Sequence, residues 1–237
     1  MTALVTKILL YGMTAVANEP GDMREEASNK SSVSSNFDSS DDETDNFDLS
    51  PFKISWLDLT PYGCEESLGI SALPGCRFKD TWRKLDNDIE CLVTEDVKEV
   101  FCLCSKGELN KYRVPRLLNS LQDAGINVHH KPFPDGMIPS IGELVQIIDD
   151  LYVSLMNNKK ALIHCFGGLG RSCFVAAALM MKFDITLSPD KAIEVLRKLR
   201  GPGAVQSVKQ FNCLHDLRDQ IVTYEAEKEE ATRSLSR

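Results

Sequence analysis

Short apolar runs alternate with segments of helical periodicity along the chain from Phe52 onward. Five of the apolar runs have the length and composition of buried strands. They lie at residues 53–59, 68–74, 98–104, 126–133 and 160–164. Because strands that alternate with helices form layered domains, the pattern predicts the α/β class, with a central, mostly parallel sheet flanked by helices.

Helix start and stop signals divide the segments between these strands. Gly125 is expected to end a helix that begins near Val114. Ser140 and Glu143 form an S-x-x-E capping box for a helix that reaches about residue 157. Ser188 is expected to cap a helix with Pro189 at its first position. Further helices are expected at about 172–183 and from about 207 past 224.

The ends of the chain differ from its centre in composition. The segment from Glu19 to about Ser50 is rich in Ser, Asp and Glu and has few large apolar residues, so it cannot bury enough surface to fold. We therefore predict a disordered acidic tail over 1–50, one folded domain over 51–224 and a frayed, charged tail over 225–237.

The first 18 residues are apolar and weakly imitate a secretory leader. A poorly ordered N-terminus is the alternative, and the role of this stretch stays open. Lys7, Gly12 and Asn18 interrupt it too often for a bilayer span, so no membrane partner is expected.

Charge and cysteine content exclude several classes of function. The chain has 35 acidic and 27 basic residues and a formal charge of -8, which disfavours a broad basic face for nucleic acid. Its eight cysteines show no C-x-x-C pair, and no two of its four histidines have i, i+4 spacing. We expect free thiols in a reducing compartment, no metal and no other cofactor.

The segment ALIHCFGGLGRS, residues 161–172, carries the strongest chemical signal. A strand, a glycine-rich loop and a helix N-terminus together form an anion site, because the first amides of a helix have no internal acceptor. The candidate phosphate-binding residues of this loop are Phe166, Gly167, Gly168, Leu169, Gly170 and Arg171.

Cys165 and Arg171 flank this loop. A free thiol with a pKa of about 8.5 is about 3 % ionised at pH 7, whereas a helix-terminal thiol with a pKa of about 5.5 is about 97 % thiolate. Arg171 can present two N–H groups to one oxyanion, which lysine cannot do. The pattern predicts a phosphate pocket with a nucleophile at its base. The alternative is that Cys165 is a buried residue at the end of a strand and Arg171 only begins a helix.

The sequence HCFGGLGRS resembles the H-C-x5-R-[ST] signature of the cysteine-dependent protein tyrosine and dual-specificity phosphatases. The segments ALPGCRFKD, CSKGELNKYRVPRLL, HHKPFPDG and LRGPGAVQSVKQFN are similar to the kinase-associated members of that family. The resemblance covers about Phe52 to Tyr224. It implies a protein tyrosine phosphatase-like fold in which Cys165 attacks phosphorus and Arg171 holds the equatorial oxygens.

The resemblance also implies supporting roles. Asp135, 30 residues before Cys165, corresponds to the general acid, although a plain Pro-Asp-Gly turn is the alternative. This loop lacks the tryptophan of the tyrosine-specific enzymes. Ser172 could donate to the sulfur or cap the helix, and His164 could orient the loop or be structural.

Two glutamines follow the GPG segment. Gln206 and Gln210 resemble the glutamines that position water in this family, but Gln210 also completes a capping box with Ser207. Cys104 ends a strand expected beside that of Cys165, so a reversible disulfide between them is a further hypothesis.

The loop between Cys165 and Arg171 contains no lysine, which disfavours highly charged inositol phosphates and favours a protein substrate. The resemblance implies a phosphorylated cyclin-dependent kinase as partner and its activation-loop phosphothreonine as substrate, and hence restraint of the cell cycle. It implies a cytoplasmic location, with the perinuclear region and the nucleus as alternatives. The competing hypothesis is a kinase-binding regulator that acts mainly by association.

Overall fold

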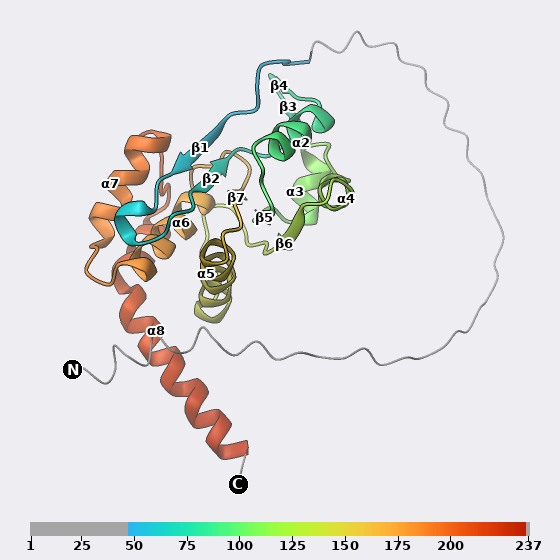
Figure 1. The fold of residues 1–237 in the computed structure, drawn as a ribbon. Helices are drawn as coiled ribbons and strands as arrows, with labels where there is room; N and C mark the ends of the chain where they lie inside the picture. The colour runs from blue at the N-terminus through green and yellow to red at the C-terminus, as the bar shows by residue number, and fades with distance from the viewer. Residues whose placement is uncertain (1–46, 236–237) are drawn as a thin grey trace, which may run out of the picture. The chain divides into compact units, whose positions relative to one another are not determined.

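A computed structural model of the chain describes residues 47–235 (Figure 1). The apolar N-terminal stretch and most of the predicted acidic tail lie outside the described residues. The last four residues of that predicted tail, 47–50, are described. There the Asp48 amide donates to the Trp82 carbonyl at 2.8 Å, and the Asp48 carboxylate pairs with Arg83 at 3.0 Å.

The central sheet has five strands in the order β1-β2-β7-β5-β6. These are β1 (Ile54–Leu57), β2 (Leu68–Ser71), β7 (Ala161–His164), β5 (Glu99–Cys102) and β6 (Asn127–His130). All neighbouring pairs are parallel except β1 and β2, which are antiparallel. The prediction of a mostly parallel sheet, and of its five strands, is confirmed.

Helices cover both faces of the sheet. The larger core cluster contains residues of α5 (Ile141–Met156), α6 (Arg171–Phe183), α7 (Pro189–Arg200) and α8 (Val208–Leu235). The smaller cluster contains residues of α2 (Leu85–Thr94), α3 (Lys106–Lys111) and α4 (Leu117–Asp123). In β7, Ile163 belongs to the first cluster and Leu162 to the second, because successive side chains of a strand point to opposite faces.

The predicted capping residues of two helices are confirmed, whereas the helix expected from near Val114 begins at Leu117. Ser140 and Glu143 make the reciprocal hydrogen bonds of a capping box at α5, and the Ser188 hydroxyl accepts from the Lys191 amide at the start of α7. The sequence reasoning did not predict α2, α3, the 3-10 turn η1 (Thr60–Tyr62) or the hairpin of β3 (Arg77–Phe78) and β4 (Thr81–Trp82).

The last helix is longer than the predicted domain. The charged segment from Glu225, predicted to be a frayed tail, continues α8 as helix to Leu235, and its described side chains are largely exposed. No helix in the described range 47–235 combines the length and apolar character needed to cross a membrane.

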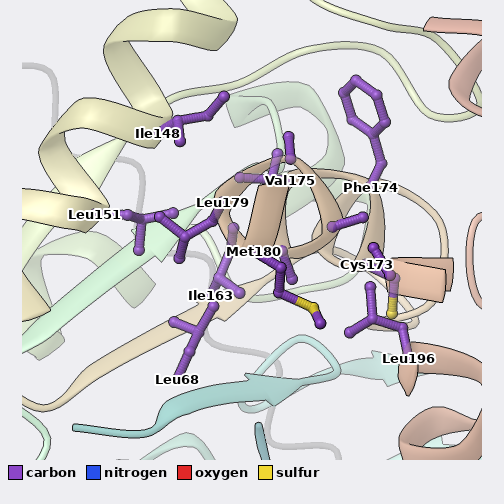
Figure 2. Packing of buried hydrophobic residues seen from close by; sticks show 14 of the residues in the cluster. Leu68, Ile148, Leu151, Ile163, Cys173, Phe174, Val175, Leu179, Met180 and Leu196 are labelled. Carbon is purple, nitrogen blue, oxygen red and sulfur yellow. The ribbon is translucent and has the colours of Figure 1, made fainter. Parts of the chain in front are cut away.

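Helix α6 is the centre of the larger core. Eleven of its 13 residues are buried. Figure 2 shows Leu179 and Met180 of α6 among Leu68, Leu151 and Ile163, which come from β2, α5 and β7. Because α6 is buried on nearly all sides, its N-terminus is held at one place, directly beyond the carboxyl end of β7. That is the edge of a parallel sheet where ligands bind.

Candidate active site

The loop between β7 and α6 lies at this edge. Cys165 follows the last residue of β7, and its side chain is 2 % exposed. Arg171 begins α6. The five loop residues between them are therefore fixed at both ends by buried elements.

The carbonyl groups of the loop point outward. Those of residues 166–169 all accept hydrogen bonds from groups outside the loop, at 3.0 to 3.1 Å. The donors are the amides of Leu73 and Val205 and the guanidinium of Arg200. Since the carbonyls are held outside, the loop amides are turned toward the space above Cys165.

These amides are available to an anion. The Gly168 amide donates to Sγ of Cys165 at 3.2 Å. Within residues 47–235, the amides of Phe166, Gly167, Leu169 and Gly170 have no hydrogen-bond acceptor. Converging amides at a helix N-terminus stabilise negative charge on the sulfur and on a bound oxyanion. The predicted anion site is thus present in the geometry of the loop.

One glycine is required by this geometry, and a second lies close to a movable side chain. Gly168 has φ +66°, and a Cβ there would collide with the Ser71 carbonyl. A Cβ at Gly170 would lie 2.8 Å from Oε1 of Gln206. A side chain at position 168 would therefore displace the loop, whereas at position 170 the exposed Gln206 side chain can move aside.

Arg171 is fully buried and held in a fixed orientation. Its Nη1 donates to the carbonyls of Leu103 and Phe133 and to Glu108, each at 3.0 Å, and its Nη2 donates to the other oxygen of Glu108 at 2.6 Å. The pair with Glu108 is therefore bidentate.

One edge of the guanidinium takes no part in these contacts. Of its five N–H groups, the one on Nε and one on Nη2 remain, and they lie side by side, as a bidentate oxyanion contact requires. Burial acts to lower the pKa of Arg171, but its hydrogen bonds to Glu108 and the charge of the nearby Cys165 raise it above its usual range. The Arg171 side chain is permanently charged.

Asp135 forms an ion pair with Arg171 at this edge. Its Oδ1 is 3.2 Å from Nε of Arg171, and its side chain is 62 % exposed. The Met137 amide donates to the Pro134 carbonyl at 3.1 Å and Gly136 has φ +70°, so the segment is also a tight turn. The segment around Asp135 therefore forms a Pro-Asp-Gly turn and also places a carboxyl group at the site.

His164 and Ser172 are both fully buried at the ends of the loop. The Ser172 hydroxyl has no hydrogen-bond partner among the described residues. Nδ1 of His164 lies 3.5 Å from the Cys165 carbonyl, and Nε2 has no partner in the same range. The Ser172 hydroxyl is thus free to donate to a group that enters the site, whereas His164 adjoins the backbone at the start of the loop.

The two glutamines differ in their contacts. Gln210 is fully buried, forms the predicted capping box with Ser207, and donates from Nε2 to the Met137 carbonyl at 3.3 Å. It therefore connects α8 to the turn that carries Asp135. Gln206 is exposed beside Gly170, and its amide has no hydrogen bond within residues 47–235. Of the two, Gln206 is the one free to position water.

Cys104 and Cys165 are both free thiols. Cys104 is fully buried and belongs to the smaller core cluster, whereas Cys165 belongs to the larger one. A hydrogen bond from Cys102 together with burial raises the pKa of the Cys104 thiol far above its usual range. A protonated, buried thiol is a poor partner for disulfide formation. The redox pair between Cys104 and Cys165 stays a hypothesis.

Sequence reasoning missed two residues that hold the site. Glu108 anchors Arg171, and Arg200 donates to the carbonyls of Gly167 and Gly168 and to the Ser55 hydroxyl. For Glu108 there was a signal, since Ser105 and Glu108 form a capping box at α3. For Arg200 there was none, because an arginine in the last turn of a helix is common.

Comparison with known proteins agrees with this geometry. Residues 27–193 match the sequence family described as cyclin-dependent kinase inhibitor 3. The protein of that name from Rattus norvegicus is 48 % identical over 203 residues, which cover 86 % of this chain and 96 % of the relative. The Homo sapiens protein is 46 % identical over the same length and coverage.

Solved structures similar to this chain include phosphatases. A crystal structure of kinase associated phosphatase, with its catalytic site cysteine substituted by serine, has a TM-score of 0.72 and 47 % identity, covering 74 % of this chain and 98 % of that one. The structure of Tk-PTP in its active form has a TM-score of 0.56 and 30 % identity, covering 70 % and 96 %. The chain belongs to the cyclin-dependent kinase inhibitor 3 family and is a cysteine-dependent dual-specificity protein phosphatase.

Proposed function

We propose that this chain dephosphorylates the activation-loop phosphothreonine of a cyclin-dependent kinase and so restrains the cell cycle. The observation that supports the reaction is the convergence of three groups on one space: Sγ of Cys165, the unpaired loop amides, and the edge of Arg171 that faces Asp135. The kinase as substrate is supported by the names of the relatives. The absence of lysine between Cys165 and Arg171 favours a protein substrate over an inositol phosphate.

In the first step, the Cys165 thiolate attacks phosphorus while the phosphoryl oxygens accept from the loop amides and Arg171. The bond from phosphorus to the threonine oxygen breaks, and the protonated carboxyl group of Asp135 gives its proton to the leaving alkoxide.

In the second step, water attacks the phosphocysteine, the S–P bond breaks, and the Asp135 carboxylate takes a proton from the water. The Ser172 hydroxyl, which has no partner among the described residues, donates to the departing sulfur. Gln206, free and adjacent to Gly170, orients the water. Inorganic phosphate leaves, and no metal enters either step, since the amides and Arg171 stabilise the charge.

The proposed substrate is tested by measuring phosphate release from a cyclin-dependent kinase phosphorylated on its activation-loop threonine. A denatured sample of the same phosphokinase is the matched control, because it has the same phosphosite without the folded surface. We expect a higher kcat/KM for the folded kinase. Equal values for the two samples, or a rate no better than that for unrelated phosphoproteins, would contradict the kinase as the preferred substrate.

The role of Asp135 is tested by Asp135→Ala. We expect turnover of a phosphothreonine substrate to fall by about 10²- to 10⁴-fold, since an alkoxide leaves slowly without a proton. An activated aryl phosphate, whose leaving group is stable as an anion, should be affected far less. Asp123→Ala, at an exposed carboxylate at the end of α4, is the control. Equal losses on both substrates would remove Asp135 from proton transfer.

A further inference from the structure

Four basic residues beside the active site have no acidic partner. Arg77 and Lys79 lie in the β3–β4 hairpin, Lys111 is the last residue of α3, and Arg113 lies two residues beyond it. We name these four the basic ridge. Within residues 47–235 none of them forms an ion pair, although the whole chain has 35 acidic residues and a net charge of -8. Three of them, Lys79, Lys111 and Arg113, are exposed.

The basic ridge rests on aromatic rings. The Lys79 ammonium lies 5.6 Å from the centre of the Phe78 ring, and the Lys111 ammonium lies 5.6 Å from Phe78 and 5.4 Å from Tyr112. The Arg113 guanidinium lies 5.3 Å from Trp82. Such contacts hold a cation in place while leaving its N–H groups free for an anion.

The same rings connect the ridge to the phosphate loop. Phe166, the residue after Cys165, stacks on Tyr112 with ring centres 4.1 Å apart, and both contact the edge of Phe78. The Arg77 amide donates to the Tyr112 carbonyl at 3.0 Å, which ties the hairpin to the end of α3. The ridge therefore has a fixed position relative to the loop.

The backbone of the ridge is unusual. Lys79 has φ +53° and Arg113 has φ +59°, the left-handed region that residues other than glycine adopt rarely. Lys79 lies in the two-residue loop of the hairpin and Arg113 directly follows the C-cap of α3, and left-handed backbone turns the chain at both places. Both left-handed residues of this surface are basic.

We propose that the basic ridge binds carboxylate side chains of the phosphoprotein substrate, close to the phosphoresidue that enters the loop. The Phe166 ring lies 4.1 Å from the Tyr112 ring, which lies 5.4 Å from the Lys111 ammonium, so the ammonium is within about three residues of extended chain from the Phe166 ring. The ridge thus selects substrates with Asp or Glu within a few residues of the phosphoresidue.

This inference deepens the proposed function and rests on its assignment of a protein substrate. It does not depend on the kinase. The phosphate loop itself has no lysine, so the ridge is separate from the site of the transferred phosphoryl group and acts on the flanking chain.

The test uses the full chain and two phosphothreonine peptides, one with Glu at positions two to four on both sides of the phosphoresidue and one with Gln there. Lys79→Gln/Lys111→Gln removes two of the four positive charges of the ridge. Lys53→Gln/Lys228→Gln is the matched control, because both lysines are exposed and form no ion pair within residues 47–235. Turnover of an aryl phosphate reports the chemistry alone.

We expect the wild-type chain and the control to prefer the Glu peptide in kcat/KM by about tenfold at low salt, and the preference to weaken as salt rises. The ridge variant should lose the preference and keep its aryl phosphate turnover. The same preference in the ridge variant, or none in the wild type, would overturn the proposal. So would ridge-dependent hydrolysis of a phosphoinositide without any peptide preference. Failure of a kinase as substrate, with the peptide preference intact, would count against the proposed kinase only.

Discussion

Replacing Cys165 with serine is expected to lower turnover of every phosphorylated substrate by a factor on the order of 10⁴ or more. The hydroxyl of serine is not ionised near neutral pH, so the loop amides that stabilise a thiolate have no anion to act on. The change is nearly isosteric at a side chain that is 2 % exposed, and the fold should be retained. Phosphate release from a phosphothreonine peptide, measured beside thermal unfolding, checks both statements.

A second buried cysteine supplies the control for this change. Cys213 lies in α8, and burial raises its pKa to about 11, so its thiol is protonated at neutral pH. Cys213→Ser should leave kcat/KM within a few-fold of the wild type. Burial likewise raises the pKa of Cys76 to about 11 and that of Cys173 to about 12. A loss confined to Cys165→Ser therefore identifies one sulfur as the nucleophile.

The same variant separates catalysis from association. If the chain acts by hydrolysis, Cys165→Ser should still bind the phosphorylated kinase and should no longer release its phosphate. If inhibition of the kinase survives the change in full, binding is the function and hydrolysis is secondary. Kinase activity assays and a pull-down with the two proteins at equal concentration distinguish these outcomes.

The fold was predictable where local signals and burial agreed. The central strands β5 and β7 are buried along their whole length, so their apolar runs were clear in the sequence. Helix α2 was missed because Lys84 at its N-cap makes no side-chain capping bond and its first turn is polar. Strands β3 and β4 have two residues each, which is too short for any periodicity.

The site was predictable only where its residues are close in sequence. Cys165, the loop and Arg171 occupy seven consecutive positions, and the chemistry of that segment is local. Glu108 lies 63 residues before Arg171, and Arg200 lies 33 residues after Gly167. Their roles depend on how α3 and α7 pack, which no spacing rule contains. Gln210 makes one contact that was predictable and one that was not. Its hydrogen bond with Ser207 is local, whereas Met137 lies 73 residues away in the sequence.

Arg171→Lys is expected to reduce kcat/KM by roughly 10³-fold, although the positive charge is kept. Lysine has three donors at one atom, so it cannot hold both oxygens of Glu108 and also present two parallel N–H groups to phosphate. It would also leave carbonyls of Leu103 and Phe133 without their present donor, which should cost about 1–3 kcal/mol of folding stability for each unsatisfied group. Activity and thermal unfolding must therefore be measured together.

A substitution of Glu108, the ion-pair partner of Arg171, tests how the guanidinium is positioned. Although burial acts to raise it, the hydrogen bonds of Arg171 and Ser105 lower the pKa of Glu108, so the carboxylate is ionised at neutral pH. Glu108→Gln removes the charge and keeps one acceptor, and we expect a loss of about tenfold. If Glu108 acts only by orienting Arg171, the double variant should be no slower than Arg171→Lys alone. Losses that multiply would instead mean that Glu108 contributes to the reaction independently of the guanidinium, and the bidentate pair would not be what positions the phosphate.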